Sequence, residues 1–460
     1  MNNYKSVIGL EIHVALKTAS KMFCGCKNDP FGAKQPNIYT CPVCLGLPGA
    51  LPVPNKKAID WTILIGRALN CTINNVSKFD RKHYFYPDLP KGYQISQYDE
   101  PIATNGFVEF PISNFQFPNK SQIQNSKNKT FRVQRVHLEE DTAKLIHEDG
   151  DTLVDFNRSG VPLVEIVTEP DFDNSDDVKR FLEEIQVIIR YLDVSDADME
   201  KGSMRLEPNI SVGKLPITND QLPNYKVEVK NINSFRFVKQ AIEYEVERQI
   251  EILQDGNMPE QETRGFDSGK GVTYSQRSKE EAHDYRYFPE PDILPLNFRE
   301  DYLDKIKVPE LPQEKIDKYL KLGLRYEDAF ILTRNKQMIN FFEAVIFNDS
   351  VQRFKKDKNI VNLEDHVAKV IINKKLSTEL QVNSFINKAI EMLQPKETDE
   401  KLLTTTINRL IVVNKKAVED YKSGKENAIM FLVGQVMREM KGKADAKVVI
   451  SKIKNQIAKI

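Results

Sequence analysis

The sequence lacks four features that would each have assigned it to a class of protein. No run of residues approaches the roughly 18 apolar positions that a membrane-spanning helix requires, and no basic segment followed by an apolar run marks a secretion signal. The 66 basic and 66 acidic residues cancel, so net charge favours no partner. No Gly-x4-Gly-Lys-Ser/Thr loop is present to hold phosphates. We therefore expect a cytoplasmic protein that contacts no membrane.

The 460 residues are enough for two or three domains, and charge is unevenly spread among them. Residues 406–460 contain 12 Lys and Arg against 5 Asp and Glu, so this tail has a surplus of seven positive charges. The first 405 residues are correspondingly acidic. A basic tail favours nucleic acid as its partner, and the alternative interpretation is an ordinary solvated helical bundle.

Patterns of apolar residues predict three regions. Residues 1–295 contain short alternating segments, typical of strands, with two long helical patterns among them. The main elements expected there are Val7–Leu16, Phe131–Glu139, Val161–Thr168 and Val227–Val229 as strands, and Asp176–Leu192 and Phe235–Leu253 as helices. Residues 296–405 and 406–460 show helical periodicity instead. We therefore predict an α+β fold, in which an antiparallel-sheet domain (1–295) precedes a helical domain (296–405) and a small all-α tail domain (406–460).

Four of the five cysteines form two close pairs, separated by 14 residues. They are Cys24, Cys26, Cys41 and Cys44. In a chain without a secretion signal, this spacing predicts a tetrahedral zinc site rather than disulfides. Because thiolates take all four positions, the metal would be structural. The alternative is a set of free thiols. The remaining Cys71 is expected to be a small buried residue in an apolar helix that begins at Ala58.

Carboxylates recur inside apolar strands, where an unpaired charge is costly. In Val7–Leu16 the apolar residues take even positions, so Glu11 and His13 share the opposite face. The segments His137–Asp141 and Leu163–Glu169 carry further carboxylates. Basic residues in similar settings are Lys144, Arg158, Arg205, Lys230 and Arg264. Oxygen ligands for Mg²⁺ together with cations for phosphate are typical of a phosphoryl-transfer site. The alternative is a set of paired salt bridges on exposed strand faces.

These segments resemble one family, the GatB subunits of the aspartyl/glutamyl-tRNA amidotransferases. The matches span nearly the whole first region and the tail, and their shared order is far more specific than a single motif. They are Val7–His13, both cysteine pairs, Ser77–Asp88, Tyr93–Gln97, His137–Asp141, Asn157–Glu165, Gly202–Arg205, Lys230–Phe235, Glu262–Arg264, Asp284–Asp292 and Phe431–Gln435. The chain departs from the family at Arg205-Leu-Glu207, where Arg-Cys-Asp is usual.

The resemblance implies a cradle domain related in fold to glutamine synthetase, and a ligase that uses ATP, Mg²⁺ and a structural Zn²⁺. ATP would phosphorylate the side-chain carboxylate of mischarged Glu-tRNA(Gln) or Asp-tRNA(Asn), because a free carboxylate is too poor an electrophile for ammonia. The residues implied to hold magnesium and its phosphates are Glu11, His13, Glu140 and Glu165. Those expected to neutralise the γ-phosphate are Lys144, Arg158, Arg205 and Lys230. Glu139, Glu207 and Arg264 are expected to contribute to cofactor binding.

The chain shows no glutaminase signature, so ammonia would have to come from a partner. The resemblance implies a heterotrimer with an amidase subunit and a small clamp-like subunit, in which the basic tail holds the tRNA. Lys82, His83 and Tyr84 are candidates for the mouth of an ammonia channel. One alternative is a non-catalytic tRNA-binding assembly subunit, which would leave the strand-borne carboxylates unexplained. A zinc-dependent hydrolase is a further alternative, but it needs an open metal position.

Overall fold

The structure is a computed structural model that describes residues 3–111, 128–215, 222–278, 286–358, 362–392, 400–425, 427–440, 444 and 446–458. The chain divides into two compact units, Met1–Lys336 and Gln337–Ile460. The three-domain division with boundaries at 295 and 405 stays a prediction. Among the described residues, no helix is long and apolar enough to cross a membrane.

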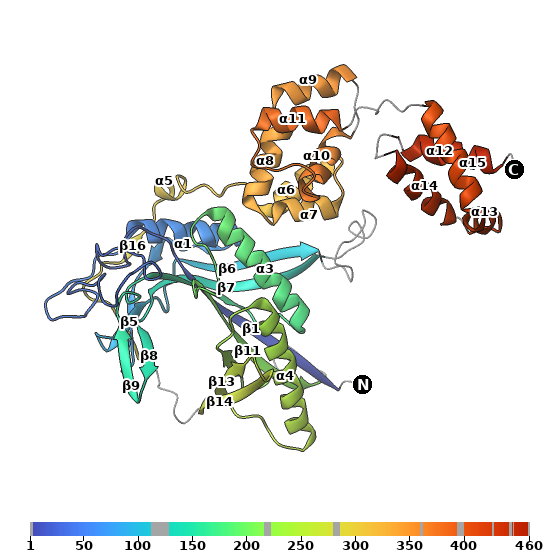
Figure 1. The fold of residues 1–460 in the computed structure, drawn as a ribbon. Helices are drawn as coiled ribbons and strands as arrows, with labels where there is room; N and C mark the ends of the chain where they lie inside the picture. The colour runs from blue at the N-terminus through green and yellow to red at the C-terminus, as the bar shows by residue number, and fades with distance from the viewer. Residues whose placement is uncertain are drawn as a thin grey trace. The chain divides into compact units, whose positions relative to one another are not determined.

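A nine-stranded sheet forms the centre of the first unit (Figure 1). Its strands in spatial order are β14 (Val272–Ser278), β13 (Glu262–Asp267), β12 (Val227–Lys230), β11 (Met204–Lys214), β1 (Tyr4–Ala15), β10 (Pro162–Thr168), β7 (Asn128–Glu140), β6 (Ala103–Pro111) and β2 (Thr72–Ile73). All neighbours are antiparallel except β12 and β13, which are parallel. This sheet, followed by helices, confirms the predicted α+β class.

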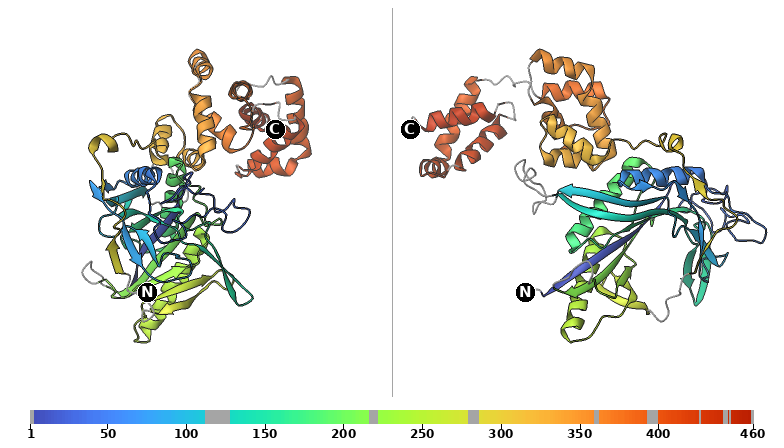
Figure 2. Two further views of the ribbon diagram at one scale, coloured as in Figure 1. Left: turned by 90° about the vertical axis from the view of Figure 1, so that its left-hand side faces the viewer. Right: turned by 180° about the vertical axis from the view of Figure 1, so that it is seen from behind.

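Three helices cover one face of this sheet: α1 (Lys56–Ala68), α3 (Ser175–Leu192) and α4 (Phe235–Gln254) (Figures 1 and 2). Each begins where a polar side chain accepts hydrogen bonds from the first backbone N–H groups, namely Asn55, Asn174 and Ser234. Alternate residues of β1, including Leu10 and Ile12, are buried in the same core as these helices. The period of two therefore leaves Glu11 and His13 on the other face.

Smaller sheets complete the first unit. A three-stranded sheet contains β15 (Arg286–Pro289), β4 (Asp80–His83) and β5 (Tyr93–Ser96). β16 (Leu296–Asn297) pairs with β3 (Val76–Ser77), and β8 (Lys144–Glu148) forms a hairpin with β9 (Asp151–Asp155). The unit ends with helices α5 (Glu300–Leu303), α6 (Pro312–Lys321) and α7 (Tyr326–Thr333).

The second unit is helical throughout its described residues. Its helices are α8 (Lys336–Ile346), which begins one residue before the unit, then α9 (Asp349–Lys358), α10 (Leu363–Ile372), α11 (Val382–Glu391), α12 (Glu400–Val413), α13 (Lys415–Lys422), α14 (Ala428–Glu439) and α15 (Ala446–Ile457). The last four share a hydrophobic core that includes Leu403, Leu432 and Ile453. The predicted tail residues 406–460 therefore contribute most of one small core.

The main predicted elements agree with the structure, and one detail is wrong. The strands expected from Val7, Phe131, Val161 and Val227 correspond to β1, β7, β10 and β12. Cys71, however, does not lie in the apolar helix, because α1 ends at Ala68 and the chain turns before β2. Its thiol is half-buried, and burial raises its pKa to about 12. The first two residues of the matched segment Asp284–Asp292 lie outside the described residues.

Candidate active site

The register of the central strands places ionisable side chains in rows across the polar face of the sheet. His13 on β1 lies opposite Glu165 on β10 and opposite Arg205 on β11. Two residues before His13 on β1, and on the same face, Glu11 lies opposite Glu207. Like charges directly opposite each other on neighbouring strands are destabilising. This face of the sheet therefore requires cations close to its carboxylates.

A cavity of about 440 Å³ lies over these rows. Its ionisable lining residues are Glu11, His13, Lys82, Tyr84, Glu139, Asp141, Glu165, Arg205, Glu207, Lys226, Glu228, Lys230 and Glu262. They come from β1, β7, β10, β11, β12, β13 and the β4 region, segments far apart in the sequence. The sheet thus gathers seven carboxylates and several cations in one cavity.

The first acidic group in the cavity contains His13, Glu139 and Glu165. His13 Nε2 lies 3.7 Å from Glu139 Oε1 and 3.6 Å from Glu165 Oε2. Both distances exceed those of good hydrogen bonds, while the ligand atoms of the three residues all lie within 4.8 Å of one another. One imidazole and two carboxylates separated by such gaps fit a divalent cation between them.

The charge states of this group indicate the same requirement for a cation. Burial would lower the pKa of His13, but Glu165 and Glu139 raise it to about 9. Burial and the nearby Glu165 raise the pKa of Glu139. The buried carboxylates therefore keep a proton on His13 when no other cation is present. A metal ion that uses His13 as a ligand would displace that proton.

His137 is a buried neighbour of this group that the sequence did not single out. Its side chain is 2% exposed, and its Nε2 lies 3.1 Å from Glu165 Oε2. Within the described part of the chain, its other ring nitrogen, Nδ1, has no hydrogen-bond partner. Against the effect of burial, His137 and His13 hold the pKa of Glu165 well below its usual range. Glu165 is therefore an anion held between two imidazoles.

The second acidic group contains Glu11, Glu207 and Glu228, whose ligand atoms also lie within 4.8 Å of one another. Lys230 Nζ lies 2.9 Å from Glu207 Oε2 and 3.3 Å from Glu228 Oε1. Against the effect of burial, Lys230 and His13 lower the pKa of Glu207 to about 2. Asn209 donates to Glu11 Oε1 at 2.9 Å. Three carboxylates around one ammonium leave a net negative charge that can attract a further cation.

Asp141 connects two of the predicted cations. Its carboxylate accepts a hydrogen bond from Arg205 Nη2 at 2.8 Å and lies 3.6 Å from Arg158 Nε. Arg158 also donates to the backbone carbonyls of Thr142 and Ala143, at 2.9 and 2.8 Å. Although burial opposes ionisation, the two guanidinium groups lower the pKa of Asp141. Arg205 therefore lines the cavity in a fixed orientation, whereas Arg158 supports Asp141 from outside the cavity lining.

The structure does not bring Glu140 to the other carboxylates. Glu140 follows Glu139 on β7, and successive side chains of a strand point to opposite faces. Its Oε1 instead accepts hydrogen bonds from Lys91 Nζ at 2.6 Å and Ile95 N at 3.0 Å. Lys144 is also absent from the cavity lining, because it lies exposed at the start of the β8–β9 hairpin.

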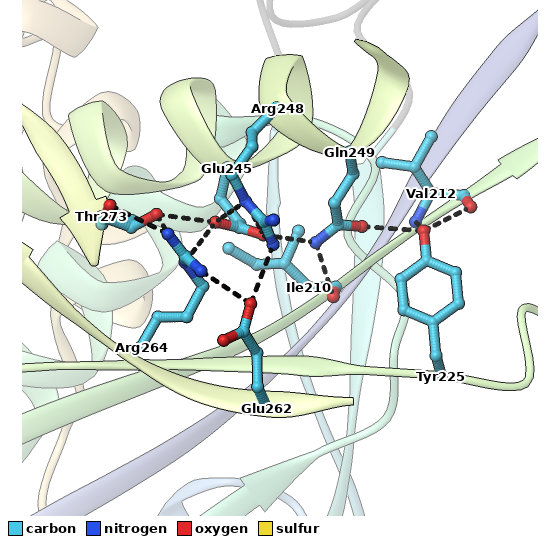
Figure 3. A network of polar contacts seen from close by, with 9 residues as sticks. All are labelled: Ile210, Val212, Tyr225, Glu245, Arg248, Gln249, Glu262, Arg264 and Thr273. Atoms are coloured by element: carbon cyan, nitrogen blue, oxygen red, sulfur yellow. Dashed lines mark hydrogen bonds and ion pairs between the residues drawn. The ribbon is translucent and has the colours of Figure 1, made fainter. Parts of the chain in front are cut away.

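Arg264 lies outside the cavity as well, in a polar network against α4 (Figure 3). Its guanidinium donates to Glu262 Oε1 at 2.6 Å and to Thr273 Oγ1 at 2.9 Å. The fully buried Glu245 at the centre of the network accepts from Arg248, Gln249 and Thr273. Arg264 is thus engaged in structural pairing, and it follows an irregularity in the register of β13 between Thr263, which lines the cavity, and Arg264, which does not.

Two of the three channel-mouth candidates, Lys82 and Tyr84, line the cavity, whereas His83 does not. Four further residues line the cavity to which the sequence pattern gave no role: Asp141, Glu228, Asn209 and Lys226. Alternation could have found Glu228, because it lies two positions before Lys230 on the same strand. Asp141 and Lys226 stand outside strands, so the strand pattern carried no signal for them.

The four predicted zinc ligands meet in one place outside this cavity. Cys44 Sγ lies 3.3 Å from Cys24 Sγ and 3.7 Å from Cys41 Sγ, and the four sulfurs are all within 4.8 Å of one another. Tetrahedral zinc with Zn–S bonds of ~2.3 Å places its sulfurs about 3.8 Å apart. A hydrogen bond from Cys24 and the nearby Lys21 ammonium lower the pKa of Cys44 to about 5, against the effect of burial. The four thiols therefore fit a zinc ion.

Comparison with known proteins identifies the family. A model of the GatB/GatE catalytic domain matches residues 6–304, and a model of the GatB domain matches residues 345–457. Curated relatives named as B subunits of aspartyl/glutamyl-tRNA(Asn/Gln) amidotransferases include one from Thermoanaerobacter sp. (strain X514), which is 42% identical over 490 residues, covering 99% of this chain and 100% of the relative. Another, from Thermotoga maritima, is 44% identical over 485 residues, 96% of each chain. This chain belongs to the GatB family.

Membership in the GatB family confirms the resemblance seen in the sequence. The names of the relatives describe one component of an amidotransferase, and such complexes are ligases. The predicted enzyme class is therefore confirmed. The catalytic-domain match includes every residue of the cavity and the four clustered cysteines.

Proposed function

We propose that this chain activates the side-chain carboxylate of mischarged Glu-tRNA(Gln) or Asp-tRNA(Asn) with ATP in the acidic cavity, so that ammonia can convert it to an amide. The observation that carries the proposal is the coexistence of two acidic groups with Lys82, Arg205 and Lys230 in one cavity. Oxygen-rich metal positions beside fixed cations are what phosphoryl transfer requires. The names of the relatives support the substrate class.

His13, Glu139 and Glu165 would hold one divalent cation, and Glu11, Glu207 and Glu228 are placed to hold a second. Magnesium, when bound, would neutralise phosphate charge and withdraw electron density from the transferred group. Glu207 fits this role despite its departure from the family pattern, because its carboxylate contacts Lys230 and lies beside those of Glu11 and Glu228.

In the first step, an oxygen of the substrate carboxylate would attack the γ-phosphorus of ATP. The bond between γ-phosphorus and its bridging oxygen breaks, and ADP leaves with the electron pair. The product is an acyl phosphate. Arg205, fixed by Asp141, and Lys230 would stabilise the negative charge that develops on the phosphoryl oxygens. Since both cations are already held by hydrogen bonds, little reorganisation accompanies the reaction.

In the second step, ammonia would attack the acyl carbon, phosphate would leave, and one ammonia proton would pass to the departing phosphate. We propose that an amidase subunit supplies the ammonia within a heterotrimer that also contains a small clamp-like subunit. Lys82 and Tyr84, at the cavity wall, are the candidates for the point of entry. The basic residues 406–460 would hold the tRNA through its phosphates. This assignment agrees with the cytoplasmic location expected from the sequence.

The cysteine group would hold a structural zinc ion. Four thiolates saturate a tetrahedral zinc ion and leave no position for water or substrate. This donor set disfavours the zinc-dependent hydrolase. The remaining alternative, a non-catalytic tRNA-binding assembly subunit, gives no reason to collect seven carboxylates in one cavity.

The proposal is tested by ATP turnover in the complex with its partner subunits, measured with and without mischarged Glu-tRNA(Gln). We expect turnover to depend on the tRNA and to be abolished by Glu165→Gln. The matched control is Glu148→Gln, which removes an exposed carboxylate at the end of β8, outside the cavity lining. If Glu165→Gln retained both ATP turnover and amidation, the chain would be a scaffold for tRNA rather than the activating component.

A further inference from the structure

A lysine is buried beside the cysteine group. Lys21 is 1% exposed, among the largest fully buried side chains of the described residues. Burying an ammonium group is costly unless hydrogen bonds and a negative charge compensate for lost hydration. Its position therefore calls for an anion nearby.

The ammonium of Lys21 uses its full donor capacity. Nζ donates to Tyr39 O at 2.7 Å, to Phe156 O at 3.0 Å and to Cys44 Sγ at 3.7 Å. An ammonium group has three N–H donors, and here each has an acceptor. Two of the acceptors are neutral carbonyl groups. The third is a sulfur that carries charge only as a thiolate.

Across the described part of the chain, no carboxylate lies within ion-pair distance of Lys21 Nζ. The buried carboxylate of Glu140 is paired with Lys91, at 2.6 Å. Cys44 is therefore the contact that can balance the charge of Lys21. The cysteine is in turn held by Ser159, whose hydroxyl donates to Cys44 O at 3.3 Å.

We propose that Lys21 is the internal counter-charge of the four-cysteine metal centre and stabilises the bound zinc through its N–H···S hydrogen bond to Cys44. Four thiolates and one Zn²⁺ carry a net charge of minus two, which is unfavourable in a half-buried site. The ammonium reduces that charge to minus one. By withdrawing electron density from Cys44 Sγ, it also makes this sulfur less easily protonated or attacked by electrophiles.

The inference builds on the assignment of zinc to the cysteines but not on the ATP chemistry of the cavity. The role of Lys21 and the ATP chemistry of the cavity can therefore fail separately, because zinc retention and ATP turnover are measured independently. Lys21 would act as a positioning residue for the metal centre. Its ammonium is engaged by the cysteine loop and by Phe156, outside the lining of the cavity proposed to bind substrate.

The test compares wild type, Lys21→Met and Asn157→Ala in the full chain. Asn157 is the matched control, since it ties down the same loop through Tyr39 N and Gln35 O, both at 2.8 Å, without charge or contact to sulfur. Zinc content is measured first, and then zinc loss to a competing chelator. We expect one zinc per wild-type chain and an affinity loss of about 10–100-fold for Lys21→Met, as for other partners of metal ligands.

Cobalt substitution separates the loss of charge from loosening of the loop. Without the N–H···S bond, the sulfur-to-cobalt charge-transfer band of Lys21→Met should move to longer wavelength, because the sulfur is more easily oxidised. Asn157→Ala should leave the band in place. If Lys21→Met does not fold, the same zinc measurements are made on Lys21→Gln. Its amide keeps N–H donors for the two carbonyls but removes the charge.

Three results would overturn the proposal. The first is wild-type zinc retention in Lys21→Met or Lys21→Gln. The second is equal zinc loss in Asn157→Ala with no band shift in any variant, which would assign the effect to the loop alone. The third is a wild-type chain that contains no zinc, which would also remove the zinc assignment itself.

Discussion

Two groups of buried carboxylates lie on opposite faces of the same sheet, and they differ in how completely they are paired. On the helix-covered face, Glu245 accepts hydrogen bonds from Arg248, Gln249 and Thr273 (Figure 3). On the cavity face, Glu165 has His137 at 3.1 Å and Glu139 has Ser96 at 3.2 Å, but both carboxylates lie 3.6–3.7 Å from His13, too far for strong hydrogen bonds. A fully paired group stabilises the fold, whereas an incompletely paired group is prepared for a ligand.

The largest effect is expected at the fully paired site. Glu245→Gln would remove the fully buried one of the two carboxylates that Arg248 and Arg264 share and leave them only Glu262, and breaking a buried ion pair costs about 3–5 kcal/mol. Urea unfolding of the full chain should show a lower midpoint for the transition of the first unit. Molecules that remain folded should retain ATP turnover close to wild type. A variant with unchanged stability would show that complete pairing is not what distinguishes the two faces.

The next largest effect is expected at Glu139, and it should differ in kind from the effect at its neighbour on β7, Glu140. Glu139→Gln should reduce ATP turnover by about 100-fold or more, because it removes a ligand of the proposed metal. The free energy of unfolding of this variant should change little, because the substitution also removes the repulsion between the carboxylates of Glu139 and Glu165. Glu140→Gln should instead lower stability, since Lys91 loses its partner. The opposite result, with turnover lost only in Glu140→Gln, would support the assignment of Glu140 that was made from the sequence.

A smaller effect is expected at Asp141, which is paired, as Glu245 is, and also lines the cavity, as Glu139 does. Asp141→Asn weakens the interaction that orients Arg205, at 2.8 Å in the wild type. Loss of such a supporting partner typically costs about 10–100-fold in activity. Steady-state kinetics should show the loss in kcat, with KM for ATP less affected. Wild-type kcat would mean that Arg205 does not depend on Asp141.

The smallest effect is expected for Lys144→Ala in the exposed β8–β9 hairpin. Because Lys144 does not line the cavity, turnover should stay close to wild type, and stability should change by less than about 0.5 kcal/mol. Turnover and thermal unfolding measured side by side provide the check. A large loss of turnover would place the hairpin over the cavity during the reaction.

Much of the fold was predictable because its signals are local. Alternation predicted β1 and β10, and helical periodicity with Asn174 and Ser234 at the helix starts agrees with α3 and α4. The cavity was predicted in part. Glu11 and His13 followed from parity on one strand, but Glu139 and Glu140 could not be told apart by residue type. Their separation depends on which face of β7 is buried against the helices.

Residue types and their short-range spacing were enough to predict the family, the main strands and helices, many of the carboxylates and cations of the site and the paired cysteines. Which of those residues meet depends on the folded chain. Strand register placed His13 between Glu165 and Arg205 and assigned Arg264 to the network around Glu245. The folding of the loop between β1 and α1 placed the Lys21 ammonium against Cys44. Such contacts join residues distant in the chain, and their formation depends on the packing of the whole sheet rather than on any local preference.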